Sequence, residues 1–388
     1  MDYETQQYKI SFPGKVFSGV GSLNQLQVII EEVKVSRVCV FTDEGVYSTG
    51  IIDSIIKILQ EASVYSEVIS TIPTEPSNDD LINIYNQAEE FQADLFIGVG
   101  GGSVMDITKV IAAASSNKEY IDDVRQISKL KNPAIPMVMI PTTAGTGSEV
   151  TRNAIFYFKD EQIKEGIVSD KFITDYVILD PNVTIKLPQR LTANTGLDAF
   201  CHAVEAYISK LNNPICNMFA LKAIELITQN IEVVFQDGTN IKARENMQLG
   251  AFYAGLCLCT SSTVAVHALS YPLGGKFRIP HGVANAMLLP HVMEANLSCC
   301  QEKFTTLAKI VLPDYKNYEE SELPQQFINY LSELTKRLMI PSKLEEFNVQ
   351  IEDLDLLTHN ALTVQRLLSQ NPKALYSDDI KGIYNKLL

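Results

Sequence analysis

The sequence predicts an α/β domain followed by an all-helical domain, and three observations lead to this fold class. Short β-branched runs alternate with amphipathic segments of helical period through the first half of the chain, as in residues 38–41 and 51–62. Strand signals almost disappear after Leu187 and Pro188, where long helical patterns take over. The length of 388 residues suits two domains of ordinary size. We therefore expect domains at residues 1–188 and 189–388, with an active site in the cleft between them.

The alternation in the first half predicts a mostly parallel sheet with helices on both faces, because strands joined through helices run in one direction. The expected strands are residues 38–41, 66–69, 94–99 and 136–141, and the expected helices are residues 51–62, 79–91 and 103–114. Residues 154–158 and 176–179 are candidates for a hairpin pair. The second half predicts helices at residues 195–209, 214–235, 241–259 and 284–296. A strand near residues 8–12 would offer an edge to a second copy of the chain, so we expect a homodimer or a higher homo-oligomer.

Composition and charge exclude several classes of protein. Apolar residues make up 46% of the chain and charged residues 20%, which excludes a disordered or fibrous chain. The net charge is −14 and no cluster of Lys or Arg interrupts it, so we expect neither nucleic acid nor a membrane as a partner. The 7 cysteines are irregularly spaced, which favours reduced thiols over a disulfide framework. No apolar run reaches about 18 residues and the first residues are polar and acidic, so the sequence predicts a cytoplasmic protein.

A glycine cluster between an expected strand and an expected helix is the first candidate binding segment. It runs from Gly98 to Ser103 and contains Gly100, Gly101 and Gly102. Bare backbone N–H groups at a helix start can approach a phosphate closely, and the helix dipole favours the negative charge. The segment does not match G-x-G-x-x-G because Ser103 holds the last position, so a simple tight turn is the alternative interpretation.

A second loop follows the next expected strand. Residues 141–148 contain Thr142, Thr143 and Thr146 together with two glycines and a serine. Hydroxyls and bare amides suit a pyrophosphate or a ribose, and loops at the ends of neighbouring parallel strands would face one crevice. Asp43 follows the first expected strand, where a carboxylate can bind an adenosine ribose and would repel a 2′-phosphate. Alone it would be read as a solvated turn residue; beside the two loops it favours NAD over NADP.

The few histidines suggest a metal site. Only 5 occur in the chain, and Asp198 and His202 are spaced so that an α-helix would place both on one face. His267 lies in another helical pattern, and His281 follows in a turn that leads into a helix. A lone histidine is more often structural, but one carboxylate with three neutral imidazoles suits Fe(II), Zn(II) or Mn(II). The sequence does not choose among these metals.

These segments together resemble the iron-containing (group III) alcohol dehydrogenases. Residues 100–109 are similar to the family's coenzyme-loop signature and residues 141–151 to its second coenzyme loop. Residues 196–207 and 267–290 are similar to its two metal-binding segments. The resemblance implies a Rossmann-like domain that binds NAD(H), a helical domain that holds one divalent metal ion, and a dehydroquinate synthase-like architecture with the active site in the interdomain cleft.

Carried over by position, the resemblance also implies individual site residues. The metal ligands would be Asp198, His202, His267 and His281, with Fe(II) favoured and Zn(II) or Mn(II) as alternatives. The coenzyme contacts would be Asp43, Gly100, Gly101, Gly102, Ser103, Thr142, Thr143, Thr146 and Lys164. Lys164 lies in a segment similar to the family's Lys-x-x-Ile strand, where an ordinary surface lysine is the alternative interpretation.

One residue departs from the family pattern. Many members have a histidine four residues after the third metal ligand, where this sequence has Tyr271. A phenol with an ordinary pKa of ~10 is a poor base at neutral pH, so the exit route of the proton stays open. We expect Tyr271 and His281 to be the catalytic residues. The segment 267–272 around Tyr271, residues 164–170 and residues 365–368 are most similar to the 4-hydroxybutyrate dehydrogenase branch.

The implied reaction is reversible hydride transfer between a short primary alcohol and NAD. A substrate with a distal anion, such as 4-hydroxybutyrate or succinic semialdehyde, would need a cation, for which we expect Arg278, with Lys276 and Arg152 as other candidates. Each of the three is otherwise an ordinary surface or domain-bridging charge. Alternatives are a sulfoacetaldehyde reductase, a generalist short-chain alcohol dehydrogenase, a hydroxyacid–oxoacid transhydrogenase and a dehydroquinate synthase-like lyase. A non-catalytic binding protein would have no use for the metal ligands.

Overall fold

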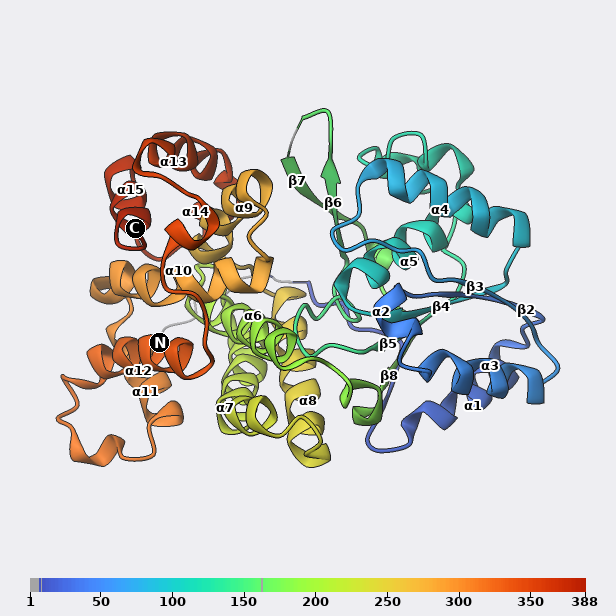
Figure 1. Cartoon of the computed structure of the whole chain (residues 1–388), viewed down its shortest axis with the longest axis horizontal. Helices are drawn as coiled ribbons and strands as arrows, with labels where there is room; N and C mark the ends of the chain where they lie inside the picture. Colours follow the sequence, from blue (N-terminus) through green and yellow to red (C-terminus); the bar gives the residue numbers. More distant parts are fainter. Residues whose placement is uncertain (1–6, 8, 162) are drawn as a thin grey trace. The chain divides into compact units, whose positions relative to one another are not determined.

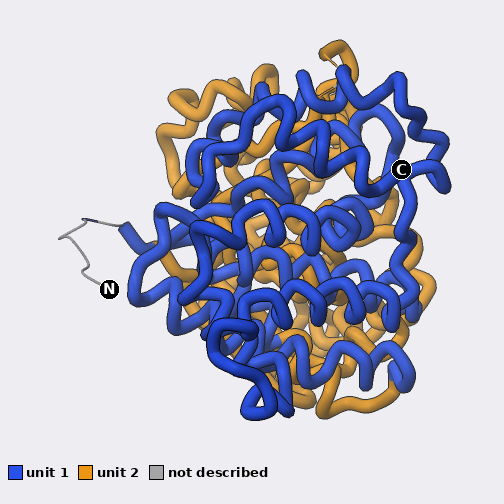
Figure 2. The backbone as a smooth tube through the Cα atoms, turned by 90° about the vertical axis from the view of Figure 1, so that its left-hand side faces the viewer, with its two compact units in different colours: residues 1–10, 188–238, 249–388 blue, residues 11–187, 239–248 orange. Residues whose placement is uncertain are grey.

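The computed structural model describes residue 7, residues 9–161 and residues 163–388. The described residues divide into two compact units (Figure 2). The sheet unit comprises residues 11–187 and 239–248, and the helical unit comprises residues 188–238 and 249–388 with the described residues before Ser11. None of the described helices is long and apolar enough to cross a membrane.

The sheet unit is built on a parallel sheet. In the described residues this sheet has six strands in the order β1-β8-β5-β4-β2-β3, and every neighbouring pair is parallel. The strands are β1 (Lys15–Ser18), β2 (Arg37–Phe41), β3 (Tyr65–Ile69), β4 (Leu95–Gly100), β5 (Met137–Pro141) and β8 (Tyr176–Leu179). β4 and β5 are buried along their whole length, as continuous apolar strands in the middle of a covered sheet are.

Helices cover both faces of this sheet, as Figure 1 shows. The helices of the sheet unit are α1 (Gln25–Val33), α2 (Glu44–Tyr47), α3 (Ile51–Glu61), α4 (Asn78–Phe91) and α5 (Gly102–Ser115). Alternate residues of a strand point to opposite faces, so Val38 and Val40 of β2 pack with α1 and α3, whereas Cys39 and Phe41 pack with α4 and α5. The expected sheet with helices on both faces is therefore confirmed.

Two expectations for this unit are wrong. The hairpin partner of β6 (Asn153–Phe158) is β7 (Ile163–Val168), which pairs with it antiparallel, and not the strand at residues 176–179. That strand, β8, is buried from Val177 to Leu179 and lies between β1 and β5 in the parallel sheet. Residues 9–12 form no strand. One edge strand of the described sheet is β1, which begins after Pro13 and Gly14, and proline has no N–H to donate to a ladder. Tyr8 lies outside the described residues, and pairing of an edge with a second copy stays a prediction.

The helical unit contains the long helices expected from the second half of the sequence. The helices of this part of the chain are α6 (Gln189–Ile208), α7 (Pro214–Gln236), α8 (Ile241–Leu258), α9 (Ala265–Phe277), α10 (His281–Asn296), α11 (Gln301–Val311), α12 (Leu323–Arg337), α13 (Leu354–Thr363), α14 (Gln365–Leu368) and α15 (Ser377–Asn385). α10 packs against both α6 and α9, which brings α6 together with two consecutive helices that are distant from it in sequence. α8 begins in the sheet unit and ends in the helical unit. The predicted fold class, an α/β part followed by an all-helical part, is confirmed.

Candidate metal centre and coenzyme loops

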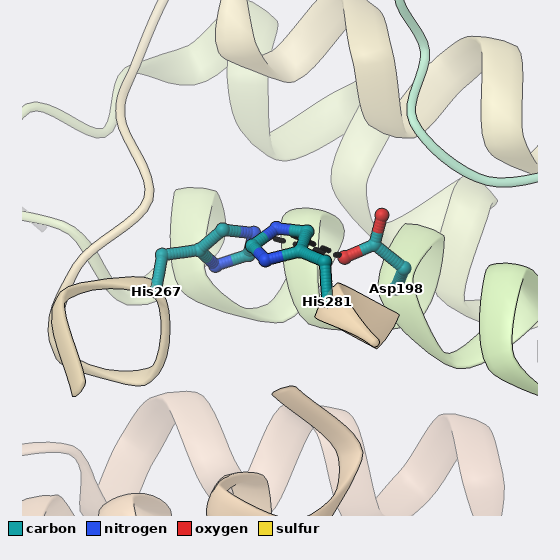
Figure 3. A group of neighbouring side chains, drawn as sticks. All are labelled: Asp198, His267 and His281. Carbon is teal, nitrogen blue, oxygen red and sulfur yellow. Dashed lines mark ion pairs between the residues drawn. The ribbon is translucent and has the colours of Figure 1, made fainter. Parts of the chain in front are cut away.

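Three packed helices of the helical unit bring the predicted metal ligands together. Asp198 and His202 lie one turn apart on α6, His267 lies on α9, and His281 is the first residue of α10. Asp198 Oδ1 lies 3.9 Å from Nε2 of His202, 3.8 Å from Nε2 of His267 and 3.7 Å from Nε2 of His281. Figure 3 shows both imidazoles of His267 and His281 pointing at the carboxylate of Asp198.

Three of the four predicted ligands form a group that could hold one metal ion. One ligand atom from each of Asp198, His267 and His281 lies within 4.8 Å of the others. His202 lies 3.9 Å from Asp198 but does not belong to this group. Asp198, His202 and His267 are buried, whereas the side chain of His281 is 29% exposed. An ion held here would therefore be enclosed by protein on the side of α6 and α9 and accessible on the side of His281.

Charges within the cluster favour the protonation states that metal ligands need. Burial alone would raise the pKa of Asp198, but the imidazoles and a hydrogen bond from Asn285 outweigh it and hold the pKa below its ordinary value. Burial lowers the pKa of His267 to about 4, against the attraction of Asp198. A carboxylate and a neutral imidazole at neutral pH are the ligand forms that bind a divalent cation.

Glu205, which sequence reasoning missed, contacts His267 at Nδ1, the ring nitrogen that does not face Asp198. Its Oε2 contacts Nδ1 of His267, and its Oε1 accepts a hydrogen bond from the backbone N–H of Val266 at 2.6 Å. Glu205 is fully buried, and burial raises its pKa to about 8. In its ionised form Glu205 accepts the Nδ1 proton and so fixes the tautomer in which the Nε2 lone pair is free for a metal ion, whereas in its protonated form it would donate to Nδ1 instead. Glu205 follows Asp198 and His202 on the same face of α6, and this spacing was the available signal.

Asn285 is a second missed residue. Its Nδ2 donates to Asp198 Oδ1 at 2.7 Å and lies 3.1 Å from Nε2 of His267 and 3.2 Å from Nε2 of His281. Asn285 comes one helical turn after His281 on α10, so its amide is fully buried beside the same three atoms. One side chain thus connects the ligand atoms of α6, α9 and α10.

The close approach of α10 to α6 depends on Gly282. A Cβ added to Gly282 would overlap the backbone carbonyl of Asn194 in α6. Any larger residue would push the first turn of α10 away from α6. Since His281 precedes Gly282 directly, this contact decides how near the imidazole of His281 can lie to Asp198.

Of the two other predicted residues of this unit, Tyr271 lies on α9 and Arg278 directly follows it. Tyr271 is half-buried, and the centroid of its ring lies 6.0 Å from that of His281. Burial raises the pKa of Tyr271, so its hydroxyl keeps its proton at neutral pH and can donate a hydrogen bond. Arg278 ends α9 with a left-handed backbone (φ 54°), and its side chain is exposed.

The predicted coenzyme segments follow three neighbouring strands of the sheet unit. Asp43 follows β2, Gly101 follows β4 and Thr142 follows β5, and β4 lies between β2 and β5. The two loops were expected at neighbouring parallel strands, and the structure confirms this placement. The carboxyl end of a parallel sheet is where α/β proteins bind their ligands; coenzyme binding itself stays a prediction.

The glycine loop and the threonine loop are in direct contact. The N–H of Thr142 donates to the carbonyl of Gly100 at 3.0 Å. A Cβ on Gly102 would lie 2.9 Å from Cγ2 of Thr146, so a larger residue would separate the loops. Glycine is therefore required here by the space available, whatever the loops bind.

A buried ionic network fastens the threonine loop to α5. Lys109 Nζ donates to Ser148 Oγ at 2.6 Å and to the carbonyl of Asn153 at 2.7 Å. Ser148 Oγ donates in turn to Asp106 Oδ1 at 2.5 Å. Lys109 is fully buried and Asp106 almost so, and their charges compensate each other. Both residues lie in the segment with family resemblance, but the sequence assigned them no role.

The remaining predicted contacts have local partners. Asp43 is the N-cap of α2, where its Oδ1 accepts from the N–H of Val46 at 2.9 Å. Lys164 on β7 pairs with Glu75, with 2.5 Å between Nζ and Oε1, so it is not an isolated surface lysine. Ser103 Oγ accepts from the backbone N–H of Glu75 at 3.1 Å, which connects Lys164 to the glycine loop through Glu75. Glu75 was missed by the sequence analysis.

A parallel sheet with glycine-rich loops and a buried carboxylate–imidazole cluster are together typical of metal-dependent oxidoreductases. Residues 13–181 match the family model "Iron-containing alcohol dehydrogenase", and residues 192–388 match "Fe-containing alcohol dehydrogenase family, C-terminal". The chain belongs to the iron-containing alcohol dehydrogenase family, and it is an oxidoreductase.

Similar proteins extend over the whole chain. A long-chain-alcohol dehydrogenase of Geobacillus thermodenitrificans is 32% identical over 97% of this chain and 95% of its own. A sulfoacetaldehyde reductase of Bilophila wadsworthia is 31% identical over 95% of this chain and 96% of its own. The crystal structure of a 1,3-propanediol oxidoreductase has a TM-score of 0.93 at 30% identity, over 99% of this chain and 100% of its own.

Proposed function

We propose that this protein is an NAD(H)-linked, metal-dependent alcohol dehydrogenase for a short primary alcohol with a distal anion, such as 4-hydroxybutyrate, and for its aldehyde, succinic semialdehyde. The observation that carries the proposal is the convergence of Asp198, His267 and His281, whose ligand atoms all lie within 4.8 Å of one another, in a member of this family. Residues 189–388 would hold the metal ion and residues 1–188 the coenzyme.

The residues of the metal centre have separate tasks in this proposal. Asp198, His202, His267 and His281 hold one divalent ion, with Fe(II) favoured and Zn(II) or Mn(II) as alternatives. The ion supplies Lewis acidity, which lowers the pKa of an alcohol oxygen or polarises an aldehyde carbonyl. Glu205 keeps the proton of His267 on Nδ1. Tyr271 keeps its hydroxyl proton at neutral pH, because its pKa lies above the ordinary value, and would donate a hydrogen bond to the oxygen of the substrate.

The coenzyme loops position the nicotinamide coenzyme in this proposal. Backbone N–H groups at Gly101 and Gly102 bind the pyrophosphate at the start of α5. Ser103 and the threonines Thr142, Thr143 and Thr146 donate hydroxyls, with Lys164 nearby on β7. Asp43 accepts from the adenosine ribose and repels a 2′-phosphate, which favours NAD. A nicotinamide coenzyme held there would supply the hydride acceptor for an alcohol or the hydride donor for an aldehyde.

The test is NADH oxidation by protein loaded with Fe(II) under anaerobic conditions and, separately, with Zn(II). The aldehydes would be succinic semialdehyde, sulfoacetaldehyde, glycolaldehyde, propanal and butanal, and His281→Ala would be the control. We expect the highest kcat/KM for succinic semialdehyde, lost in His281→Ala. Equal rates for the neutral aldehydes would instead define a generalist alcohol dehydrogenase.

A sulfoacetaldehyde reductase is the second candidate, because a protein of that name is 31% identical over nearly the whole length of both chains. A preference for sulfoacetaldehyde in the same panel would establish it. Hydride exchange without added coenzyme would point to a transhydrogenase, and product without net NADH turnover would point to a lyase.

A further inference from the structure

The amide of Asn285 lies where three of the proposed ligand atoms converge. Its Nδ2 lies 2.7 Å from Asp198 Oδ1, 3.1 Å from His267 Nε2 and 3.2 Å from His281 Nε2. Asp198, His267 and His281 are the group drawn in Figure 3, which could hold one metal ion. An ion ~2.0–2.2 Å from the ligand atoms of this group would lie among them, and therefore directly beside the amide of Asn285.

The two ends of this amide are unequally satisfied in the structure. Nδ2 carries two hydrogens, whereas three acceptor atoms surround it. Oδ1 is buried and has no hydrogen-bond partner within the described part of the chain. An amide oxygen buried in this way has lost its hydrogen bonds to water and gained none in return. Asn285 therefore has an acceptor that a cation can use.

A cation among the three ligand atoms reverses which end of the amide fits beside them. The lone pairs of a carboxylate and two neutral imidazoles attract N–H groups and repel an amide oxygen. A divalent ion repels N–H groups and attracts the oxygen, because the amide oxygen of asparagine is a metal ligand and its nitrogen is a donor. Half a turn about the Cβ–Cγ bond of Asn285 exchanges the two ends, and helix α10 need not move.

An amide oxygen also changes which ion such a centre prefers. Asp198, His267 and His281 supply one carboxylate and two imidazoles, a set that suits Fe(II) when further positions are open. A carbonyl oxygen is a hard ligand that suits Mn(II), whereas Zn(II) typically has four ligands and takes nitrogen and sulfur readily. An oxygen from Asn285 would therefore strengthen the binding of Mn(II) more than that of Zn(II).

We propose that Asn285 is a ligand of the metal ion: its amide turns when the ion binds, and Oδ1 then contacts the ion. The inference rests on the metal-dependent activity proposed above and adds to it a residue that determines metal selectivity. Asn285 shifts the preference of the centre from Zn(II) toward the ions that favour oxygen ligands, Mn(II) and Fe(II).

The experiment measures the Kd of Mn(II) and of Zn(II) for the full chain by competition with a chelator. Asn285→Leu removes the oxygen and keeps a similar volume, and Asn285→Asp replaces the amide by a carboxylate. In Asn285→Leu, Mn(II) binding should weaken about 10- to 100-fold and Zn(II) binding less, so the ratio of the Mn(II) Kd to the Zn(II) Kd should rise. In Asn285→Asp this ratio should fall below the wild-type value, because a carboxylate oxygen is a harder ligand.

Asn296→Leu is the matched control. Asn296 is a fully buried asparagine at the end of α10, and its amide exchanges hydrogen bonds with Asn371 at 3.1 and 2.8 Å. The same substitution there removes a buried amide of the same helix away from the ligands. It should lower the Tm and leave the ratio of the two Kd values at the wild-type value.

Co(II) gives a spectroscopic readout that needs no catalysis. Its visible absorption depends on the number and type of its ligands. The spectrum of the bound ion should change in Asn285→Leu and stay unchanged in Asn296→Leu. A residue that only orients Asp198 would weaken the binding of both ions equally and leave the spectrum as it is. An unchanged ratio in Asn285→Leu or in Asn285→Asp, or an unchanged spectrum in Asn285→Leu, would therefore overturn the inference.

These measurements separate failure of this inference from failure of the proposed function. The predicted changes in a protein that reduces no aldehyde would support Asn285 as a ligand and overturn the dehydrogenase. A wild type that binds none of the three ions would overturn the metal centre and this inference with it. Wild-type ratios and spectra in the Asn285 variants of an active enzyme would overturn the inference alone.

Discussion

Glu205 contacts Nδ1 of His267 through Oε2, while its Oε1 accepts from the backbone N–H of Val266, the residue directly before His267. One buried carboxylate thus holds both the ring of a proposed ligand and the first turn of the helix that carries it. The ring cannot rotate about its Cβ–Cγ bond without breaking the contact to Oε2. His267 is therefore oriented toward Asp198 before any ion binds, and the entropy of ordering it is already lost in the folded chain.

Glu205→Gln should weaken metal binding about 10- to 100-fold, because an amide does not fix the Nδ1 proton of His267 as a carboxylate does. The Kd for Zn(II) or Co(II) can be measured by competition with a chelator, independently of activity. Glu294→Gln is the matched control, since Glu294 pairs with Lys386 on the partly exposed side of α10. An unchanged Kd in Glu205→Gln would show that His267 needs no orienting partner.

Gly282→Ala should lower stability by about 1–3 kcal/mol and weaken metal binding as well, because its Cβ would overlap the carbonyl of Asn194 and displace His281. Gly382→Ala is a control within the same unit: no atom lies within 4 Å of its added Cβ, and it is in α15. That substitution should raise stability by about 0.5–1 kcal/mol. Thermal unfolding and zinc titration of both variants measure these effects. If Gly282→Ala and Gly382→Ala had the same Tm and the same zinc affinity, the close approach of α10 to α6 would not depend on Gly282.

Glu149 makes stability depend on pH. It is buried, and burial raises its pKa to about 7, against the attraction of Lys109. A raised carboxyl pKa means that the folded chain binds a proton more tightly than the unfolded chain. The contribution of Glu149 to the free energy of unfolding is fully present below about pH 4.5. It is lost as the pH rises through 7, and the loss is up to about 3 kcal/mol.

Glu149→Gln removes this titration. The Tm of Glu149→Gln minus that of the wild type should therefore be larger at pH 8 than at pH 5. For Glu31→Gln, at an exposed position of α1, this difference should be the same at both pH values. A Tm difference between Glu149→Gln and the wild type that is the same at both pH values would contradict the assignment.

Asp43→Ser tests the coenzyme preference without removing the helix cap. Serine can still accept from the N–H of Val46, so α2 keeps its start, while the charge that would repel a 2′-phosphate is lost. The ratio of kcat/KM with NADPH to that with NADH should rise about 10-fold or more. Asp53→Ser, in the first turn of α3, removes a nearby charge as a control. An unchanged ratio would show that Asp43 only caps α2.

Local patterns predicted most of the fold. The apolar runs of β2, β4 and β5 and the helical period of α3 and α4 depend on neighbouring residues, so the sequence alone indicates them. Pairing of β6 was mistaken because the sequence of β7, Ile163–Val168, alternates poorly and places Lys164, Glu165 and Gly166 together. A hairpin partner is selected by contacts between strands, which a pattern within one strand does not contain.

In the site, too, residues on one helix could be predicted from the sequence, whereas contacts between distant helices could not. Asp198 and His202 were found through their spacing on one helix, and a spacing of one turn on α10 could have added Asn285 to His281. The contact of Glu205 with His267 joins two helices 62 residues apart in sequence. Contacts between helices this far apart have no signature in a single sequence.

Helix α8 also constrains the order in which the newly made chain can fold. Gln248 Nε2 donates to the carbonyl of Pro141 at 3.1 Å, and Arg244 Nη2 donates to the carbonyl of Leu187 at 3.2 Å, both inside the sheet unit. These donors are synthesised only after α6 and α7. A ribosome that has just released Leu187 has therefore not yet supplied the groups that satisfy these two carbonyls. A fragment cut at that point is expected to be less stable than its complete sheet suggests.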